Sequence, residues 1–112
     1  MKIAFTSTGK DWDALIDPRF GRAKYLVLYD EENDLLTVLD NHEADEMGHG
    51  AGTATTQKLA EINPDLLITG NGPGENASNA LKHLNIKILT GAHDLSLRQA
   101  YEKFQFGQLG ES

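Results

Sequence analysis

Short strand-like runs alternate with amphipathic helical segments along this chain, and that order limits the folds open to it. Three runs rich in leucine, β-branched and aromatic residues come first, and each of two later runs is followed by a helical segment. The order β-β-β-α-β-α-β-α requires one mixed sheet covered by helices. The expected strands are 2–7, 24–30, 35–41, 65–69 and 87–90.

Three segments repeat apolar residues at the helical spacing of three and four positions. Asn63-Pro64 ends the first segment. A capping box of Ser96 and Gln99 opens the third. The apolar stripes are Ala51, Ala54, Thr55, Leu59 and Ile62 in the first, Ala77, Ala80, Leu81 and Leu84 in the second, and Leu97, Ala100, Tyr101 and Phe104 in the third.

The order of the segments also predicts how the strands pair. The second and third strands are separated only by the turn-forming EEND, which indicates an antiparallel hairpin. The later strands are joined through helices, as in right-handed parallel crossovers. We therefore expect a three-layer α/β/α domain over residues 1–112. Its five-stranded mixed sheet should have the order 3-2-1-4-5, with strand 2 antiparallel.

Composition excludes several classes of function. The chain has no cysteine, which removes disulfides, thiolate metal ligands and thiol nucleophiles. Its net charge of −7 argues against binding of nucleic acid, because phosphate contacts need clustered lysine and arginine. No apolar run approaches the ~20 residues that span a bilayer. The chain opens without a basic and apolar leader, so we expect a cytoplasmic protein with no membrane contact.

The expected topology brings four loops to one edge of the sheet. In open α/β sheets, ligands bind beyond the carboxyl ends of the strands, near the point where the strand order reverses. The carboxyl ends of strands 1, 3, 4 and 5 should share this edge. The segments 8–23, 41–52, 70–74 and 90–94 then meet there, and they carry His42, His49, His93, Arg19 and Arg22.

Each feature of this edge has a structural and a functional interpretation. The glycine turn 70–74 is either a plain tight turn or a cradle of N–H groups that binds an anion at a helix start. Arg19 is the best-placed positive group. His42 and His49 fit no standard zinc spacing, so they are either solvated or imidazole ligands of a soft metal centre.

Five stretches in a fixed order resemble a known family. They are FGRA (20–23), Asn41, HGAG (49–52), GNGPG (70–74) and SLRQAYEKFQFGQL (96–109). Over essentially the whole chain, this series is similar to the nitrogenase iron–molybdenum cofactor biosynthesis domain family. The resemblance implies a ribonuclease H-like fold. It also implies non-covalent binding or carriage of a metal–sulfur cluster of the iron–molybdenum or molybdenum–copper type, without catalysis.

The resemblance also implies the residues and partners of the site. The implied partners are the metal cluster and cluster-assembly proteins. Among the histidines, the resemblance favours His49 as a metal ligand, with His42 as its companion. The expected cluster contacts are Arg19, Phe20, Gly21, Asn41, Gly50, Gly70, Asn71, Gly72 and Gly74.

Two alternatives to a cluster carrier remain open at this point. One is a regulatory or protein-interaction domain that binds no ligand. The other is a metal-dependent nuclease of the ribonuclease H-like type, whose chemistry needs carboxylates fixed on the central strands. The run KIAFTS carries none, and DLLIT carries only Asp65 at its far end, so the nuclease is the poorer alternative.

Overall fold

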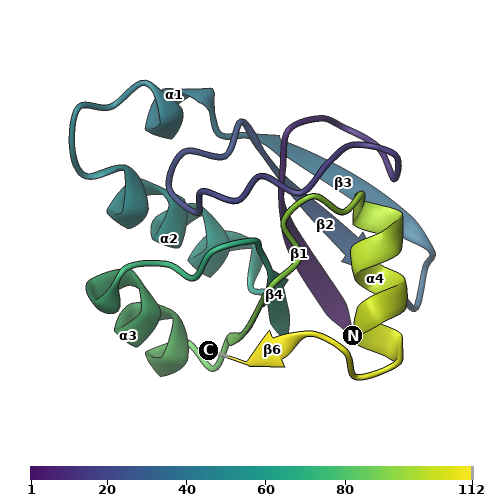
Figure 1. Ribbon diagram of the computed structural model, residues 1–112. Coiled ribbons are helices and arrows are strands. Elements are labelled where there is room, and N and C mark those ends of the chain that lie inside the picture. Colours follow the sequence, from purple (N-terminus) through teal and green to yellow (C-terminus); the bar gives the residue numbers. More distant parts are fainter. Residues whose placement is uncertain (112) are drawn as a thin grey trace.

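The computed structural model describes residues 1–111 apart from the side chain of Asp45, so Ser112 of the predicted domain lies outside it. One mixed sheet has the strand order β3-β2-β1-β4-β5-β6 (Figure 1). β2 is antiparallel to both β1 and β3, whereas β4 is parallel to β1 and β5. The strands are β1 (Lys2–Ser7), β2 (Tyr25–Asp30), β3 (Leu35–Asp40), β4 (Leu66–Ile68), β5 (Lys87–Thr90) and β6 (Gly110–Glu111).

The predicted order 3-2-1-4-5 with an antiparallel strand 2 is confirmed, but the prediction of five strands is wrong in one detail. A sixth strand, β6, pairs antiparallel with β5 at the edge of the sheet. It has two exposed residues, Gly110 and Glu111, and neither carries the apolar side chain that marks a strand in a sequence. β6 forms only because the chain after the last helix returns alongside β5.

Helices lie on both faces of the sheet, as the class prediction requires. The three predicted helical segments form α2 (Ala51–Ile62), α3 (Glu75–His83) and α4 (Leu97–Gln105). A fourth, α1 (His42–Asp45), is one turn inside the segment for which the sequence shows no periodicity. A local contact supports this turn, because the carboxylate of Asp40 accepts a hydrogen bond from the backbone N–H of His42 at 2.8 Å. The ribonuclease H-like classification stays an expectation from the resemblance.

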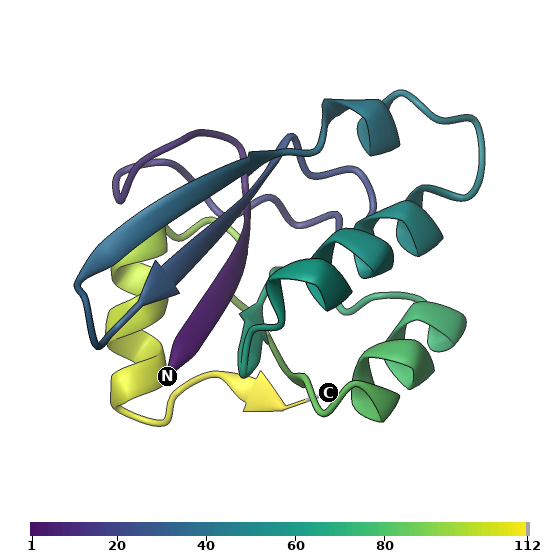
Figure 2. The same ribbon diagram turned by 180° about the vertical axis from the view of Figure 1, so that it is seen from behind.

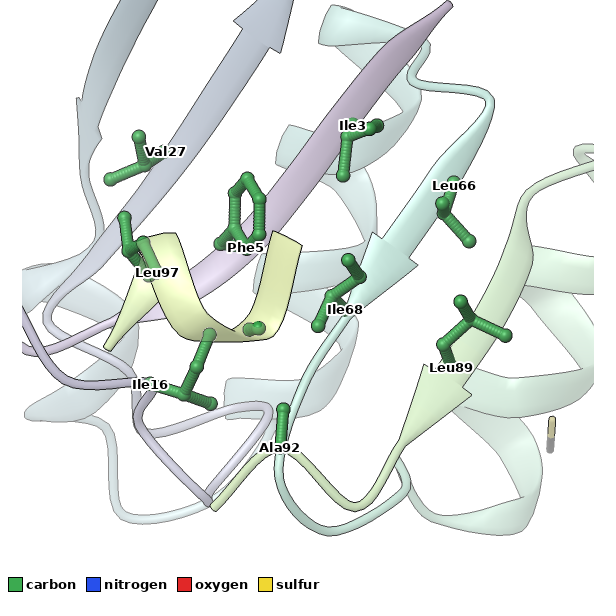
Figure 3. Packing of buried hydrophobic residues seen from close by; sticks show 10 residues of the cluster. Ile3, Phe5, Ile16, Val27, Leu66, Ile68, Leu89, Ala92 and Leu97 are labelled. Atoms are coloured by element: carbon green, nitrogen blue, oxygen red, sulfur yellow. The ribbon is translucent and has the colours of Figure 1, made fainter. Parts of the chain in front are cut away.

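Alternate residues of the central strands build two separate cores. On the face covered by α4, Ile3 and Phe5 pack with Leu97 and with side chains from the neighbouring strands (Figure 3). On the opposite face, Ala4 and Leu67 pack against the α2 and α3 side. Figure 2 shows α2 and α3 together on one side of the sheet and α4 on the other. None of the helices in residues 1–111 is long and apolar enough to cross a membrane.

The sheet brings the predicted loops together at the carboxyl end of β1. The ends of three strands are aligned, since Ser7 pairs with Tyr25 and Tyr25 with Asp40. Loop 8–23 is then joined to the loop after β4, where the N–H of Asn71 donates to the carbonyl of Pro18 at 2.9 Å. The same loop also bonds to the segment after β5, from the N–H of Ile16 to the carbonyl of Leu95 at 2.8 Å.

Candidate anion-binding cleft

A cleft of about 620 Å³ lies between the first turns of α2 and α3. Figure 1 shows the N-terminal ends of both helices on the same side of the molecule, with the loop that precedes β2 close to the start of α2. Three segments therefore line the cleft: the end of loop 8–23 and the two helix starts with the residues before them. The lining residues are Phe20, Gly21, Arg22, Gly50, Ala51, Gly52, Thr53, Gly72, Pro73, Gly74, Glu75, Asn76 and Ala77.

The start of α2 has no side-chain cap. Gly50 occupies the N-cap position in the left-handed region, with φ of 81°, and has no side chain that could accept a hydrogen bond. The first helical bond is made by the N–H of Ala54, which donates to the carbonyl of Gly50 at 3.0 Å. The N–H groups of the preceding turn have no partner inside the helix. The first turn also contains no acidic residue to balance the positive end of the helix dipole.

The start of α3 repeats this arrangement with one difference. Gly74 is the N-cap without a side-chain hydrogen bond, and the N–H of Ser78 is the first to bond back to it, at 2.8 Å. The difference is Glu75, an acidic residue in the first turn. Two helix N-termini that are not capped by side chains therefore border one cleft. Such N–H groups, together with the helix dipole, favour an anion.

Close backbone approaches hold loop 8–23 against the other two walls. A Cβ atom on Gly21 would lie 2.9 Å from the backbone nitrogen of Gly52, and one on Gly70 would lie 2.6 Å from Cα of Pro18. Real Cβ contacts are essentially never this short, so both positions require glycine. These contacts hold the loop over the end of β4 and against the first turn of α2.

Arg22 and Glu75 are the charged residues of the lining. The guanidinium of Arg22 donates to the carbonyls of Met47 and Gly48, so it also holds the segment between α1 and α2. Arg19, which we expected to be the main positive group, does not line the cleft. Its Nε lies 3.3 Å from Oδ1 of the buried Asp17.

The predicted contact residues fall into two groups. Those that line the cleft are Phe20, Gly21, Gly50, Gly72 and Gly74. The others lie outside the lining. Gly70 and Asn71 support loop 8–23, Arg19 pairs with Asp17, and Asn41 is fully buried.

Neither predicted metal-ligating histidine lines the cleft. His49 is exposed, directly before Gly50. His42 opens α1, where its Nδ1 lies 2.6 Å from Oδ1 of Asp40 and its ring packs edge-on against Tyr25. Hydrogen bonds from the backbone N–H and the side chain of His42 hold the pKa of Asp40 below its usual value. Among the described residues, no three His, Asp or Glu side chains gather in a group that could hold a metal ion.

The sequence interpretation missed most of the helical part of the lining. It did not select Ala51, Gly52 or Thr53 of α2, nor Glu75, Asn76 and Ala77 of α3. A signal for them exists, because both helices start directly after glycine, whereas α4 starts at Ser96 with a complete capping box. A helix that begins without Ser, Thr, Asp or Asn at its N-cap keeps its first N–H groups available.

The chain is similar to two solved structures over almost its whole length. The apo form of the orange protein from Desulfovibrio gigas is 36% identical, with a TM-score of 0.92, and the match covers 99% of this chain and 92% of that one. A Thermotoga protein described as a candidate NifB protein of the DUF35 family is 31% identical, with a TM-score of 0.82. That match covers 98% of this chain and 91% of the other.

A comparison with curated proteins gave no match. The family model described as dinitrogenase iron-molybdenum cofactor, in contrast, matches residues 1–107. This match spans the sheet through β5, all four helices and every wall of the cleft. The chain belongs to the dinitrogenase iron-molybdenum cofactor family.

Proposed function

We propose that the cleft between α2 and α3 binds an anionic metal–sulfur cluster and carries it as cargo. The observation that supports this most directly is the pair of helix N-termini without side-chain caps that border one glycine-lined cleft. Membership of the dinitrogenase iron-molybdenum cofactor family supports a metal–sulfur cluster over other anions. We expect a cluster of the iron–molybdenum or molybdenum–copper type.

The cleft suits such a cargo in size and chemistry. Its volume of about 620 Å³ lies within the range of ~300–1,000 Å³ common for small-molecule sites. Glycine and alanine at the helix starts allow the cluster to approach the backbone closely. Because the chain has no cysteine, the protein contributes no thiolate ligand. The cluster would arrive complete with its own sulfides, which accept hydrogen bonds from the backbone N–H groups.

We further propose a carrier rather than an enzyme. Its partners would be cytoplasmic cluster-assembly proteins that deliver and remove the cargo. A cargo held by hydrogen bonds, shape and an exchangeable imidazole ligand leaves intact when a competing partner binds it, because no bond within the cluster breaks. The open cleft and the few charged residues of its lining favour exchange of this kind.

The predicted histidine ligands remain part of the proposal. His49 lies one residue before Gly50, so its imidazole is attached to the rim of the cleft. His42 is oriented by Asp40, and when Nδ1–H donates to that carboxylate, Nε2 keeps the lone pair that ligates a metal. We propose His49 as the first candidate, because it is bonded directly to the lining.

The test places a negative charge at the start of α3. A Cβ on Gly74 would meet nothing within 4 Å, and its φ of −61° with ψ of 166° suits an N-cap side chain. In Gly74→Asp the carboxylate should cap the helix and compete with an anion for the same N–H groups. We expect tetrathiomolybdate, titrated by its absorption, to bind about tenfold more weakly. The free energy of unfolding should change by only a few tenths of a kcal/mol.

Two matched variants separate charge from capping. Gly74→Asn adds the same hydrogen bond without charge, so it should weaken binding less than aspartate does, and the gap should shrink at high salt. Gly74→Ala adds a methyl group without a cap and should bind nearly like wild type. If aspartate at position 74 leaves tetrathiomolybdate affinity unchanged, the start of α3 is not part of the site.

His49→Ala tests the histidine ligand separately. An exposed imidazole contributes little to stability, so the free energy of unfolding should change by no more than about 0.5 kcal/mol. Loss of a ligand should weaken the binding of a preformed molybdenum–copper–sulfide cluster by about tenfold. His83→Ala is the control, because His83 is exposed in the last turn of α3. Equal cluster affinity in the two variants would remove His49 from the site.

A further inference from the structure

Asn41 makes three hydrogen bonds inside the fold, and they connect two walls of the cleft. Its side chain is completely buried. Nδ2 donates to the carbonyl of Ala23 at 2.9 Å and to Oγ1 of Thr55 at 3.1 Å. Its backbone N–H donates to the carbonyl of Lys24 at 2.8 Å. Ala23 follows the wall formed by residues 20–22, and Thr55 lies in α2 two residues after the wall formed by residues 50–53.

We propose that Asn41 is a positioning residue that sets the distance between loop 8–23 and α2, and thereby the relative position of two walls of the anion cleft. In this role it acts through Ala23 and Thr55 and does not touch the cargo. The inference rests on the function proposed above only for its consequence, which is a change in affinity. The hydrogen bonds that carry it are independent of any ligand.

The two hydrogen bonds from Nδ2 of Asn41, to Ala23 and to Thr55, are called the tie below. Their chemistry explains why an amide stands at this position. One nitrogen supplies two N–H donors, and both acceptors lie within its reach. Aspartate would set a buried charge against a carbonyl oxygen, and an apolar side chain would leave that carbonyl unsatisfied. The amide brings its own penalty, because Oδ1 of Asn41 is buried and has no hydrogen-bond partner among the described residues. Burying an acceptor without a partner is unfavourable, so the two donated bonds must outweigh it.

The close contact between the two walls makes their spacing sensitive to this tie. Gly21 lies so near the first turn of α2 that a Cβ would be 3.1 Å from the backbone carbon of Ala51 and 3.2 Å from Cα of Gly52. A small displacement of either wall therefore changes the position of the N–H groups at the start of α2. Anion binding by a fixed set of donors depends on that geometry.

The experiment removes the tie at Thr55, because Asn41→Ala leaves a buried cavity and is expected to fold poorly. Thr55→Val deletes the acceptor at nearly constant shape. Thr55→Ser retains the hydroxyl and serves as the rescue variant. Thr69→Val is the matched control, because it deletes another buried hydroxyl. That hydroxyl lies 2.8 Å from the hydroxyl of Thr6, which donates to Asp17 of loop 8–23, but it makes no hydrogen bond to α2.

Two readouts are compared in these variants. The first is tetrathiomolybdate affinity, which we expect to fall about tenfold in Thr55→Val, with Thr55→Ser and Thr69→Val close to wild type. The second is the amide resonances of Gly21 and Gly52 in the ligand-free protein, which should shift in Thr55→Val and not in Thr69→Val. Unfolding measurements should show comparable destabilisation by the two valine substitutions.

The outcomes distinguish this inference from the proposed function. If Thr55→Val binds like wild type and leaves both glycine resonances unmoved, the positioning role is refuted. Equal weakening by Thr55→Val and Thr69→Val would also refute it, because destabilisation alone would then explain the effect. If wild type does not bind tetrathiomolybdate at all, the proposed function fails. The glycine resonances then decide on the positioning role by themselves.

Discussion

The helices on the two faces of the sheet start in different ways. On the α4 face, aromatic side chains fill the space. The ring centroid of Trp12 lies 4.8 Å from that of Tyr29 and 5.7 Å from that of Tyr101. α4 itself starts with both bonds of a capping box, at 2.9 and 3.1 Å. On the opposite face, α2 and α3 start at glycines with no side-chain cap, and an open cleft lies between them.

This contrast concerns the backbone N–H groups at the helix starts. The first N–H groups of α4 all have partners within the protein. Those of Leu97 and Arg98 donate to carbonyls of loop 8–23, and that of Gln99 donates to the hydroxyl of Ser96, which stabilises this helix start. An uncapped helix forgoes that stabilisation and presents its donors to the surroundings. The α4 face therefore contributes mainly to stability. The cleft between α2 and α3 lies at helix starts without side-chain caps, and this is the basis of the anion binding that we propose.

The largest effect on this contrast should come from Leu97→Ala on the α4 face. Leu97 is fully buried beside Phe5 and Val27, and truncating such a side chain usually destabilises by about 2–5 kcal/mol. Urea unfolding measures the loss. Tetrathiomolybdate affinity of the folded fraction should stay at the wild-type value, because no wall of the cleft changes. Weakened binding without unfolding would show that the two faces are coupled.

Gly21→Ala should affect stability and binding together. Its methyl group would meet the backbone of α2 at 2.9 Å, and neither backbone segment can move freely. We expect the free energy of unfolding, measured with urea, to fall by about 1–3 kcal/mol. The cleft should also widen and bind anions more weakly. Gly48→Ala is the control, because a Cβ there meets nothing within 4 Å. If both alanine variants behave alike, the close approach of Gly21 is unimportant.

Glu75→Gln should strengthen anion binding and slightly lower the free energy of unfolding. The carboxylate lies in the lining and repels an anion, so its removal should raise tetrathiomolybdate affinity severalfold at low salt. The same carboxylate interacts favourably with the α3 dipole, so the glutamine variant should lose roughly 0.3–1 kcal/mol of stability. Glu102→Gln in α4 is the control. Affinity that does not rise in Glu75→Gln would place the bound anion away from α3.

The smallest effect at neutral pH concerns Tyr101 on the α4 face. Burial, and then the hydrogen bond to Glu31 at 2.5 Å, raise the pKa of Tyr101 from 10.0 to about 12. Because the folded-state pKa is the higher one, this contribution to stability is complete below pH 10.0 and is lost as pH rises toward about 12. Between these two pH values, the melting temperature should fall more steeply with rising pH in wild type than in Tyr101→Phe. Equal slopes would refute the linkage.

Periodicity in the sequence was enough to predict the sheet order and the three long helices. Apolar spacing reports which face of a helix is buried, and the short hairpin turn between β2 and β3 determines their pairing. The elements that escaped prediction, α1 and β6, are too short to repeat any pattern. α1 is supported by a bond from His42 to Asp40, and β6 by its partner β5. Neither contact is visible in composition.

The sequence alone determined the fold class, the absence of cysteine ligands and the edge of the sheet at which loops 8–23, 41–52, 70–74 and 90–94 were expected to meet. It also determined that α2 and α3 start without capping side chains, because glycine stands at both N-cap positions. Only the tertiary structure decided which donors share one cleft and that Asn41 is buried between its walls instead of lining it. The physical reason is that hydrogen bonds and close backbone contacts between distant segments depend on three-dimensional packing, whereas helix and strand periodicity is local.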